Sequence, residues 1–321
     1  MTAVPLSEFD LIREYFSHAT AARSDVQLGI GDDCALLVPP AGKVLAVSID
    51  TLVAGRHFEP DVDPESLGHK ALAVNLSDLA AMGAEPAWAT LALTLPAADS
   101  DWLRGFMRGL SALAAEYSLQ LVGGDTTRGP LSITIQVHGF CDPAHALRRS
   151  GASAGERLFV SGSVGGAALA LQRSARGQPV APVLQERLDR PQPRVALGRL
   201  LAGRASAAID VSDGLVADLG HVCAASAVGA EIKLASLPLL PEVAEVCAGS
   251  DWQLPLAGGD DYELLFSVAP ERVDSLLADC RAAGHDVQEI GRLVDRPGVR
   301  LIYPDGRISE DVPDGYDHFT R

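Results

Sequence analysis

The sequence predicts a mixed α and β protein built from two α/β domains, and three observations support this prediction. The 321 residues are enough for two domains of ordinary size, each with a core of its own. Segments that alternate like strands are interleaved with segments of helical period along the whole chain. A small and polar stretch, residues 150–156, marks a change in composition, so we divide the chain into residues 1–148 and 149–321.

The first half begins with a short amphipathic helix at residues 7–17, which Ser7 can cap, and a strand at residues 43–49. A long helical pattern over residues 64–82 ends at Gly83, where a glycine after the helix is expected. An apolar strand at residues 88–95 is stopped by Pro96. A second long helix follows at residues 99–118, and further strands are predicted at residues 119–122 and 131–140.

The second half opens with a strand at residues 157–161, and a glycine-rich turn at residues 162–166 leads into an Ala- and Leu-rich helix. Residues 173–194 contain four prolines and are predicted to be rich in loops. A strand at residues 207–211, a helix at residues 215–226 and a strand at residues 230–235 follow. A closing α/β stretch to Tyr303 completes the expected domain.

The composition is that of a soluble globular protein, since 47% of the residues are hydrophobic and 21% are charged. The apolar stretch at residues 87–98 is too short to span a membrane, and the first ten residues lack the features of a signal peptide. Five scattered cysteines without a Cys-x-x-Cys pair argue against disulfides or a zinc site, so a cytoplasmic location is expected. The net charge of −16 argues against nucleic-acid binding.

Six short clusters place carboxylates beside glycine or at the end of a strand. Carboxylates at this density repel one another, and a buried charge without a partner is expensive. Lysine and arginine are nearly absent from the clusters, so we do not expect them to be the main counter-charge. The oxygen ligands of Asp, Ser and Thr suit Mg²⁺ or Mn²⁺, and Mg²⁺ also binds water and substrate phosphates. The clusters span residues 29–33, 48–51, 75–78, 123–127, 210–214 and 258–263.

One such cluster is explained by a turn, because Gly, Asp, Ser and Thr are the usual residues of turns and helix caps. Six of them favour a site for metal and phosphate. The chain has no Walker-type G-x-x-x-x-G-K-[ST] motif and no protein-kinase motifs. Residues 29–31 begin like a dinucleotide-binding motif, but Asp32, Asp33 and Cys34 follow where its third glycine belongs.

Taken in order, the clusters resemble the thiamine-monophosphate kinase family, which shares a superfamily with aminoimidazole ribonucleotide synthetase and selenophosphate synthetase. The resemblance covers essentially the whole chain, and His57-Phe58 and the C-terminal motif point to the thiamine branch. Its motifs are Gly-Ile-Gly-Asp-Asp-Cys-Ala at 29–35, Asp-Thr-Leu-Val-Ala-Gly-Arg-His-Phe at 50–58, Asn-Leu-Ser-Asp-Leu-Ala-Ala-Met-Gly-Ala at 75–84, Gly-Gly-Asp-Thr-Thr-Arg-Gly-Pro at 123–130, Val-Ser-Asp-Gly-Leu at 211–215 and Gly-Tyr-Asp-His-Phe at 315–319.

The resemblance implies an N-terminal domain that binds metal and ATP and forms a homodimer, and a C-terminal domain that completes the cleft for ATP and substrate. The metal ligands it implies, for several Mg²⁺ ions, are Asp33, Ser48, the backbone carbonyl of Ile49, Asp50, Asp78, Asp125, Asp210 and Asp213. The implied ATP contacts are Gly124, Asp125, Arg149 and Ser212. The implied contacts of thiamine monophosphate are His57, Asp260 and Tyr316. Relatives often have Gly-Gly-Glu-Asp where this chain has Gly-Gly-Asp-Asp at 258–261, so the acid is shorter here.

The implied reaction is a direct, in-line attack by a phosphate oxygen of thiamine monophosphate on the γ-phosphorus of ATP, giving thiamine diphosphate and ADP. A phosphate monoester is largely ionised at neutral pH, so positioning and charge neutralisation matter more than a strong base. Two other interpretations remain: another ATP-dependent kinase or synthetase of the superfamily, and a nucleotide-binding protein without turnover. Without the resemblance, His57 reads as an ordinary loop histidine, Arg149 as a solvated arginine and Tyr316 as a packing residue.

Overall fold

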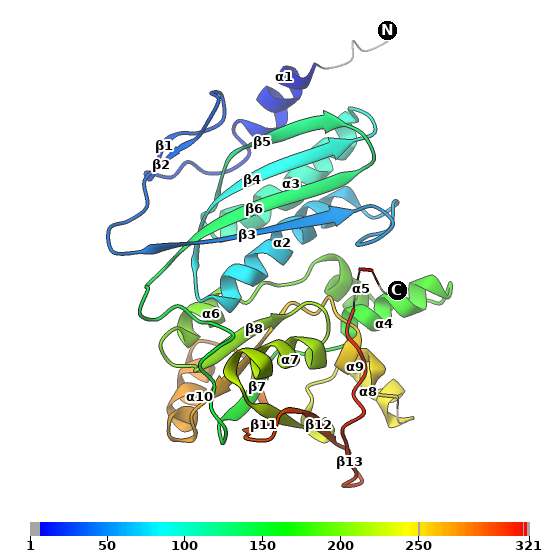
Figure 1. Ribbon diagram of the computed structural model, residues 1–321. Helices are drawn as coiled ribbons and strands as arrows, with labels where there is room; N and C mark the ends of the chain where they lie inside the picture. Colours follow the sequence, from blue (N-terminus) through cyan, green and yellow to red (C-terminus); the bar gives the residue numbers. More distant parts are fainter. Residues whose placement is uncertain (1–6, 250, 317, 320–321) are drawn as a thin grey trace. The chain divides into compact units, whose positions relative to one another are not determined.

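The computed structural model describes residues 7–249, 251–316 and 318–319, and the chain divides into two units. Unit 1 comprises Met1–Leu79 and Ala84–Pro143, and unit 2 comprises Ala80–Gly83 and Ala144–Arg321. Each unit contains its own sheet and its own helices, which confirms the expected mixed α and β class (Figure 1). Among the described residues, no helix has the length and apolar character needed to cross a bilayer.

Unit 1 is built on a four-stranded sheet in the order β3-β6-β4-β5, and helices α2 and α3 cover one of its faces (Figure 1). Strands β3 and β4 both pair antiparallel with β6, whereas β4 and β5 are parallel. The elements are α1 (Glu8–Leu11), a π-helix (Ile12–Phe16), β1 (Val26–Leu28), β2 (Leu36–Leu37), β3 (Val44–Val53), α2 (Pro64–Ala81), β4 (Glu85–Leu95), α3 (Ser100–Glu116), β5 (Gln120–Arg128) and β6 (Ser132–Cys141).

The two faces of this sheet differ, because the helices cover only one of them. Ser48, Asp50 and Leu52 of β3 lie on the side of the sheet that α2 covers, and Val47, Ile49, Thr51 and Val53 point to the other side. On that side Val47 is 51% exposed and Ile49 is 59% exposed. We call this side the open face of unit 1. An edge strand with exposed apolar side chains is a surface that proteins usually cover.

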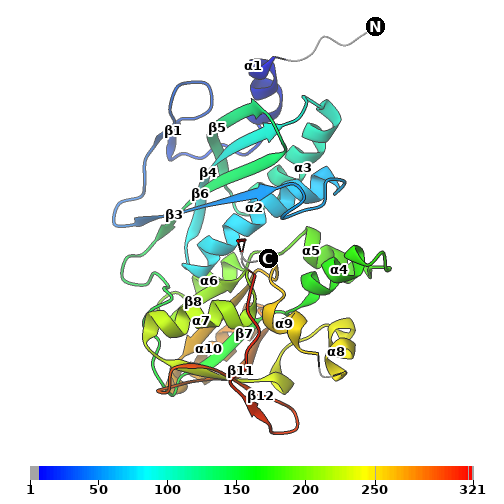
Figure 2. The same ribbon diagram turned by 45° about the vertical axis from the view of Figure 1, so that its right-hand side comes forward.

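Unit 2 is built on a seven-stranded sheet in the order β13-β12-β9-β11-β7-β10-β8. Helix α7 packs on one face, against β8, β9 and β12 (Figure 2). Phe159 and Phe266 stack on the other face, with ring centroids 5.5 Å apart. The elements are β7 (Arg157–Ser161), α4 (Gly166–Ala175), α5 (Pro182–Asp189), α6 (Val195–Leu201), β8 (Ala207–Val211), α7 (Leu215–Ser226), β9 (Gly229–Lys233), α8 (Pro241–Ala248), α9 (Gln253–Ala257), β10 (Glu263–Val268), α10 (Val273–Ala282), β11 (Val287–Val294), β12 (Gly298–Ile302) and β13 (Ile308–Ser309), with 3-10 turns at Leu234–Ser236 and Pro270–Arg272.

Several local predictions are confirmed by this structure. The strands at residues 157–161 and 207–211 and the helix at residues 215–226 have the predicted bounds. Gly83 follows α2 with a φ of +67°, a left-handed conformation that glycine adopts without strain. Helix α3 begins at Ser100, one residue after the predicted start, because Asp99 is its N-cap and accepts hydrogen bonds from the backbone N–H groups of Asp101 and Trp102. These features depend on short stretches of sequence.

Two local predictions are wrong. The segment 173–194 is not mainly loop, because α5 occupies Pro182–Asp189 and α4 extends to Ala175. Pro182 stands in the first turn of α5, where its missing N–H group is not needed, so this proline starts a helix. The segment 7–17 is not one α-helix: a single α-turn, Glu8–Leu11, leads into a π-helix over Ile12–Phe16.

Candidate functional site

In unit 1 three of the predicted metal ligands lie where the edge strand β3 meets helix α2. The hydroxyl of Ser48 donates a hydrogen bond to Oδ2 of Asp78. The backbone N–H of Asp50 donates to Oδ1 of Asn75 at 3.2 Å, and Nδ2 of Asn75 donates to the carbonyl of Ala71 at 3.0 Å. The buried Asn75 therefore satisfies an N–H group of the edge strand and fastens the strand to the helix. This contact brings Ser48, Asp50 and Asp78 together.

Asp125 lies on the other side of the same sheet. The sheet register aligns it with Ala92, Thr134 and Thr51, and the hydroxyls of these two threonines are 2.9 Å apart on the open face. The neighbouring row aligns Gly124 with Leu91, Ile135 and Asp50. Strands β3 and β5 are at opposite edges of the sheet. Within one unit, the structure therefore does not bring Asp125 to the carboxylates of β3 and α2.

The other predicted residues of unit 1 lie in turns or in the paired strands β3 and β6. The N–H of Asp33 donates to the carboxylate of Asp32 at 2.8 Å. Nδ1 of His57 accepts from the N–H of Val53 at 3.0 Å, and the N–H of His57 donates back to the Val53 carbonyl at 3.0 Å. This turn holds the imidazole at the end of β3, with the proton of the neutral ring on Nε2. Ile49 is aligned with Gln136 of β6.

In unit 2 the predicted residues converge on the connection between β8 and α7, residues 211–214. The carbonyl of Val211 accepts from the N–H of Tyr262 at 2.8 Å, and the carbonyl of Ser212 accepts from the N–H of Asp260 at 2.8 Å. The carbonyl of Asp213 accepts from the N–H of Tyr316 at 2.9 Å. Backbone bonds therefore bring together Ser212, Asp213, Asp260 and Tyr316. We call residues 211–214 the β8–α7 loop.

The segment that is hydrogen-bonded to this loop, residues 260–262, has an unusual backbone. Asp260 has a φ of +60° and Tyr262 a φ of +50°, a region that residues other than glycine rarely adopt. The hydroxyl of Tyr262 donates to Oδ1 of Asp260 at 3.1 Å. At Gly259 a Cβ atom would lie 2.6 Å from the Ser212 carbonyl oxygen, so this position requires glycine. The Asp260 N–H bond to the Ser212 carbonyl and the Tyr262 hydroxyl bond to its carboxylate hold Asp260 in this backbone conformation.

Of the two remaining predicted residues of unit 2, Asp210 lies in β8 and Arg149 lies in the segment before β7. Asp210 is buried in the strand and is aligned with Leu264 of β10. The backbone carbonyl of Arg149 accepts a hydrogen bond from the hydroxyl of Ser226 at 3.0 Å, while its side chain is exposed. Asp317, in the C-terminal motif, lies outside the described residues.

The carboxylate of Asp213 is unfavourable to ionise in the isolated chain. Burial raises its pKa, His318 and His221 lower it, and the nearby charge of Asp260 raises it. A neighbouring cation would reverse the balance, because opposite charge favours the carboxylate form. A partly buried carboxyl group whose pKa is raised in this way is a candidate for a functional site.

Sequence reasoning missed Asp218, which lies in the first turns of α7. Its side chain is buried, and its Oδ2 accepts hydrogen bonds from the N–H groups of Ser212 at 3.0 Å and Asp213 at 3.1 Å. Burial, and next the charge of Asp213, raise the pKa of Asp218 to about 7. The Asp at this position follows the Val-Ser-Asp-Gly-Leu motif at a helical spacing, and this spacing is the only signal that the sequence contained.

Sequence reasoning also missed the partners of Glu263. This carboxylate is 1% exposed and pairs with Arg187 at 2.9 Å and with Nε of Arg194 at 2.6 Å, while the hydroxyl of Ser161 donates to it at 2.5 Å. The expectation that arginine would not neutralise the clusters is therefore wrong for the cluster at residues 258–263. Both arginines come from the region around α5, which is far away in the sequence.

The described residues contain no group of three or more His, Cys, Asp or Glu side chains placed to hold a metal ion by themselves. In unit 1 the Ser48 hydroxyl and the Asp78 carboxylate meet, and both groups have oxygen atoms that can bind a metal ion. Mg²⁺ usually takes one or two carboxylates and completes its shell with water and substrate phosphate. The donor set fits such a partly formed site rather than a closed protein cage.

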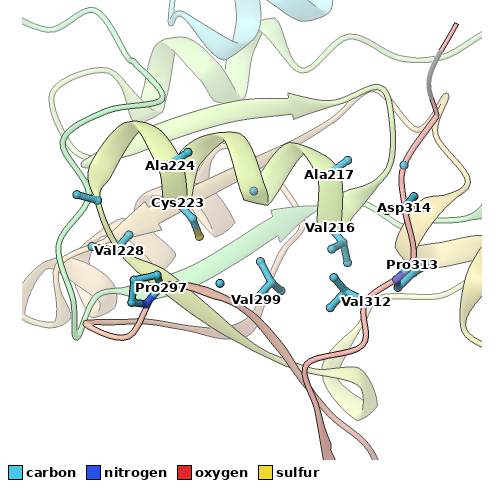
Figure 3. A pocket seen from close by; sticks show the side chains of 14 residues that line it. Val216, Ala217, Cys223, Ala224, Val228, Pro297, Val299, Val312, Pro313 and Asp314 are labelled. Carbon is cyan, nitrogen blue, oxygen red and sulfur yellow. The ribbon is translucent and has the colours of Figure 1, made fainter. Parts of the chain in front are cut away.

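A cavity of about 590 Å³ in unit 2 lies between α7 and the segments 297–299 and 312–315 (Figure 3). Its lining is mainly apolar, with Val216, Cys223, Val299 and Val312 among the side chains that face it. As far as the chain is described, the lining includes none of the predicted ligands. An apolar pocket of this kind does not suit phosphate, so we do not assign it to the phosphoryl-transfer site.

Comparison with known proteins assigns both units to one family. Residues 31–141 match the N-terminal domain of AIR synthase related proteins, and residues 153–304 match their C-terminal domain. A thiamine-monophosphate kinase of Escherichia coli strain K12 is 47% identical over 322 residues, which cover 98% of this chain and 98% of that protein.

Two solved structures are similar in fold and sequence. The crystal structure of a thiamine-monophosphate kinase from Stenotrophomonas maltophilia K279a has a TM-score of 0.83 and 45% identity, covering 89% of this chain and 93% of that one. AaThiL complexed with AMPPCP and TMP has a TM-score of 0.77 and 32% identity, covering 88% of this chain and 89% of that one. The chain belongs to the thiamine-monophosphate kinase family of AIR synthase related proteins.

Proposed function

We propose that this chain transfers the γ-phosphoryl group of ATP to thiamine monophosphate, giving thiamine diphosphate and ADP. The observation that carries the proposal is the identity of 47% with a thiamine-monophosphate kinase along 98% of both chains. The similar structure of AaThiL contains AMPPCP and TMP. The convergence of Ser212, Asp213, Asp260 and Tyr316 on one loop supports it from the structure itself.

In this reaction an oxygen of the thiamine phosphate forms a bond to the γ-phosphorus, and the bond from that phosphorus to the β-phosphate oxygen breaks. The transfer is direct and in line, so the work of the protein is to position two anions and to balance their charge. We assign Asp260 and Tyr316 to the thiamine phosphate, together with His57. Gly124, Asp125, Arg149 and Ser212 are assigned to ATP.

We propose Mg²⁺ as the cofactor, in several copies, because the assigned ligands are carboxylate, hydroxyl and carbonyl oxygens. When bound, Mg²⁺ neutralises phosphate charge and stabilises the charge that develops on the transferred group. The residues assigned to it are Asp33, Ser48, Ile49, Asp50, Asp78, Asp125, Asp210 and Asp213. Of these, Ser48 and Asp78 are in hydrogen-bond contact. Burial raises the pKa of Asp213, and a bound cation would favour its ionised form.

We propose a homodimer that forms through unit 1. Its support is the open face, where Val47, Ile49 and Val53 of the edge strand β3 are exposed. Pairing of two such faces would remove apolar surface from water. Asp125 is on the same face, so a dimer of this kind would place it at the interface.

The cytoplasmic location that we propose is supported by five free thiols and no observed disulfide among the described residues.

The proposal is tested by incubating the protein with Mg-ATP, with and without thiamine monophosphate, and measuring both ADP and thiamine diphosphate. We expect ADP to form only with the substrate, in a 1:1 ratio to thiamine diphosphate, and to stop when EDTA removes the metal. ATP binding without substrate-dependent ADP would favour a nucleotide-binding protein instead. ADP formation with other small acids or phosphates, but not with thiamine monophosphate, would favour another kinase or synthetase of the superfamily.

A further inference from the structure

The β8–α7 loop contains two successive peptide units whose hydrogen bonds form a regular pattern. The first unit consists of the Val211 carbonyl and the Ser212 N–H, and the second of the Ser212 carbonyl and the Asp213 N–H. The two carbonyls accept from the N–H groups of Tyr262 and Asp260, both at 2.8 Å. The two N–H groups donate to the same oxygen, Oδ2 of Asp218, at 3.0 and 3.1 Å.

In a trans peptide unit the N–H and the C=O groups point in opposite directions within one rigid plane. Each of these two planes is therefore held from both sides, by the Asp218 carboxylate on one side and by the segment 260–262 on the other. A rotation of either plane would break both of its hydrogen bonds at once. The orientation of the loop and the position of Asp260 are thereby linked through Asp218.

Asp218 is itself held firmly. Its side chain is buried with a relative exposure of 3%, and its own N–H donates to the carbonyl of Gly214 at 3.0 Å in the first turn of α7. Without this carboxylate, two partly buried N–H groups would lose their acceptor. The next carbonyl along, that of Asp213, accepts from the N–H of Tyr316 at 2.9 Å, so the same loop also positions the C-terminal segment.

We propose that Asp218 is a positioning residue for phosphoryl transfer, which orients Ser212 and Asp213 directly and Asp260 through the shared peptide planes. This inference rests on the proposed function, because Ser212, Asp213 and Asp260 are assigned there to ATP, metal and substrate. Asp218 itself contacts backbone N–H groups, and it acts through the residues that it holds.

A purely structural role makes a different prediction. An acidic residue in the first turn of a helix stabilises that helix through its charge alone. In that case only the stability of the protein would depend on Asp218, and removal of the charge would matter more than removal of the acceptor. The Asp218→Asn and Asp218→Ala variants separate the two roles, because both lack the charge but only Asn keeps an oxygen that can accept from the two N–H groups.

The experiment compares the wild type, Asp218→Ala, Asp218→Asn and the control variant Cys223→Ala, which alters a buried residue on the same helix, one that lines the cavity in Figure 3. We expect Asp218→Ala to raise the concentrations of Mg²⁺ and ATP needed for half-maximal rate by about 10–100-fold, as for other residues that orient ligands. Binding of Mg-AMPPCP, measured by calorimetry without turnover, should weaken in parallel. Asp218→Asn should restore most of both, and Cys223→Ala should leave both unchanged.

Hydrogen exchange gives a local measurement that needs no activity. Amides of residues 211–214 and 260–262 should exchange faster in Asp218→Ala than in Cys223→Ala. If the Ala variant does not fold, Asp218→Ser replaces it, because the serine hydroxyl is too short to reach both N–H groups. Unchanged metal and ATP dependence in a folded Asp218→Ala, or equal losses in Asp218→Asn and Asp218→Ala, would overturn the inference. A wild type without substrate-dependent ADP would instead refute the proposed function, and the exchange data would still report the loop.

Discussion

The two groups of candidate ligands are held in different ways. In unit 1, Ser48 and Asp50 belong to a ten-residue strand, Asp78 belongs to an 18-residue helix, and side chains make the contacts between these elements. In unit 2, Ser212 and Asp213 lie in a loop, and their backbone N–H and C=O groups make the contacts. Regular elements support the first group, whereas a network of hydrogen bonds supports the second.

This difference affects how far a substitution acts. In unit 1 a substitution of one candidate metal-binding residue removes one oxygen atom that could bind the metal, and it leaves the strand and the helix in place. In unit 2 the same peptide units hold residues from three segments, so a change in the loop is transmitted to Asp260 and Tyr316. We therefore expect local effects in unit 1 and coupled effects in unit 2. Four predictions test this comparison.

The largest effect is expected at Asp78 of unit 1. Asp78→Asn keeps the size and can still accept from Ser48, but it loses the charge that binds the cation. Because a bound metal contributes several kcal/mol to transition-state stabilisation, kcat/KM should fall by roughly 10²–10³-fold. The thermal midpoint should hardly change. Steady-state kinetics and calorimetry measure both, with Asp101→Asn at the exposed start of α3 as the matched control. Wild-type kinetics in Asp78→Asn would contradict the assignment.

Gly124 is the candidate site residue of unit 1 at which a side chain would meet the backbone of a neighbouring strand. A Cβ atom there would lie 1.9 Å from the Leu91 carbonyl oxygen, whereas at Gly123 it would lie 3.8 Å from Cγ2 of Thr90. Gly124→Ala should therefore destabilise the protein by about 1–3 kcal/mol through overpacking, and Gly123→Ala by much less. Thermal and urea unfolding provide the measurement. Equal stabilities of the two variants would show that β5 adapts, and that regular strands do not constrain this part of the site.

A third prediction concerns a buried carboxylate of unit 2. Burial raises the pKa of Asp261 well above 3.8, although both its oxygens accept from the N–H of Gly165. Between the unfolded and the folded pKa, the folded state binds the additional proton, so stability should fall as the pH rises, by up to about 1.4 kcal/mol per pH unit. The charges of Glu263 and Arg187 also act on this group, Glu263 raising the pKa and Arg187 lowering it.

Urea unfolding at a series of pH values above 3.8 measures this dependence. Asp261→Asn should remove the part of the pH dependence of the unfolding free energy that comes from Asp261, because the amide does not titrate. Asp101→Asn, at an exposed position of unit 1, should retain it. Identical slopes in the wild type and in Asp261→Asn would show that this carboxyl group does not titrate differently on folding.

The smallest effect is expected at Tyr316, because its backbone and side chain have separate roles. Tyr316→Ala keeps the N–H that bonds to the Asp213 carbonyl, so the β8–α7 loop should stay intact. Loss of the ring should raise the KM for thiamine monophosphate by about 2–10-fold, the value of one aromatic contact, and leave the KM for ATP unchanged. Tyr316→Phe is the control and should resemble the wild type. A parallel rise in both KM values would mean that the side chain supports the loop itself.

The sequence alone determined those features that depend on neighbouring residues. The strands at 157–161 and 207–211 and the helix at 215–226 were predicted from their own residues, and the structure gives them the same bounds. The Val-Ser-Asp-Gly-Leu motif marked the β8–α7 loop for the same reason, since its aspartate and its glycine are adjacent in the chain. Segment 173–194 misled the prediction, because proline breaks a helix in its interior but starts one at Pro182.

Only the tertiary structure decided which distant groups meet. Arg194 and Glu263 are 69 positions apart, and Ser48 and Asp78 are 30 positions apart, so no local pattern relates them. The side of the sheet on which Asp125 lies depends on the register of four strands, in which a shift by one residue would exchange the two faces. Periodicity expresses the conformation of a short segment, whereas hydrogen bonds and ion pairs between segments depend on how the whole unit packs.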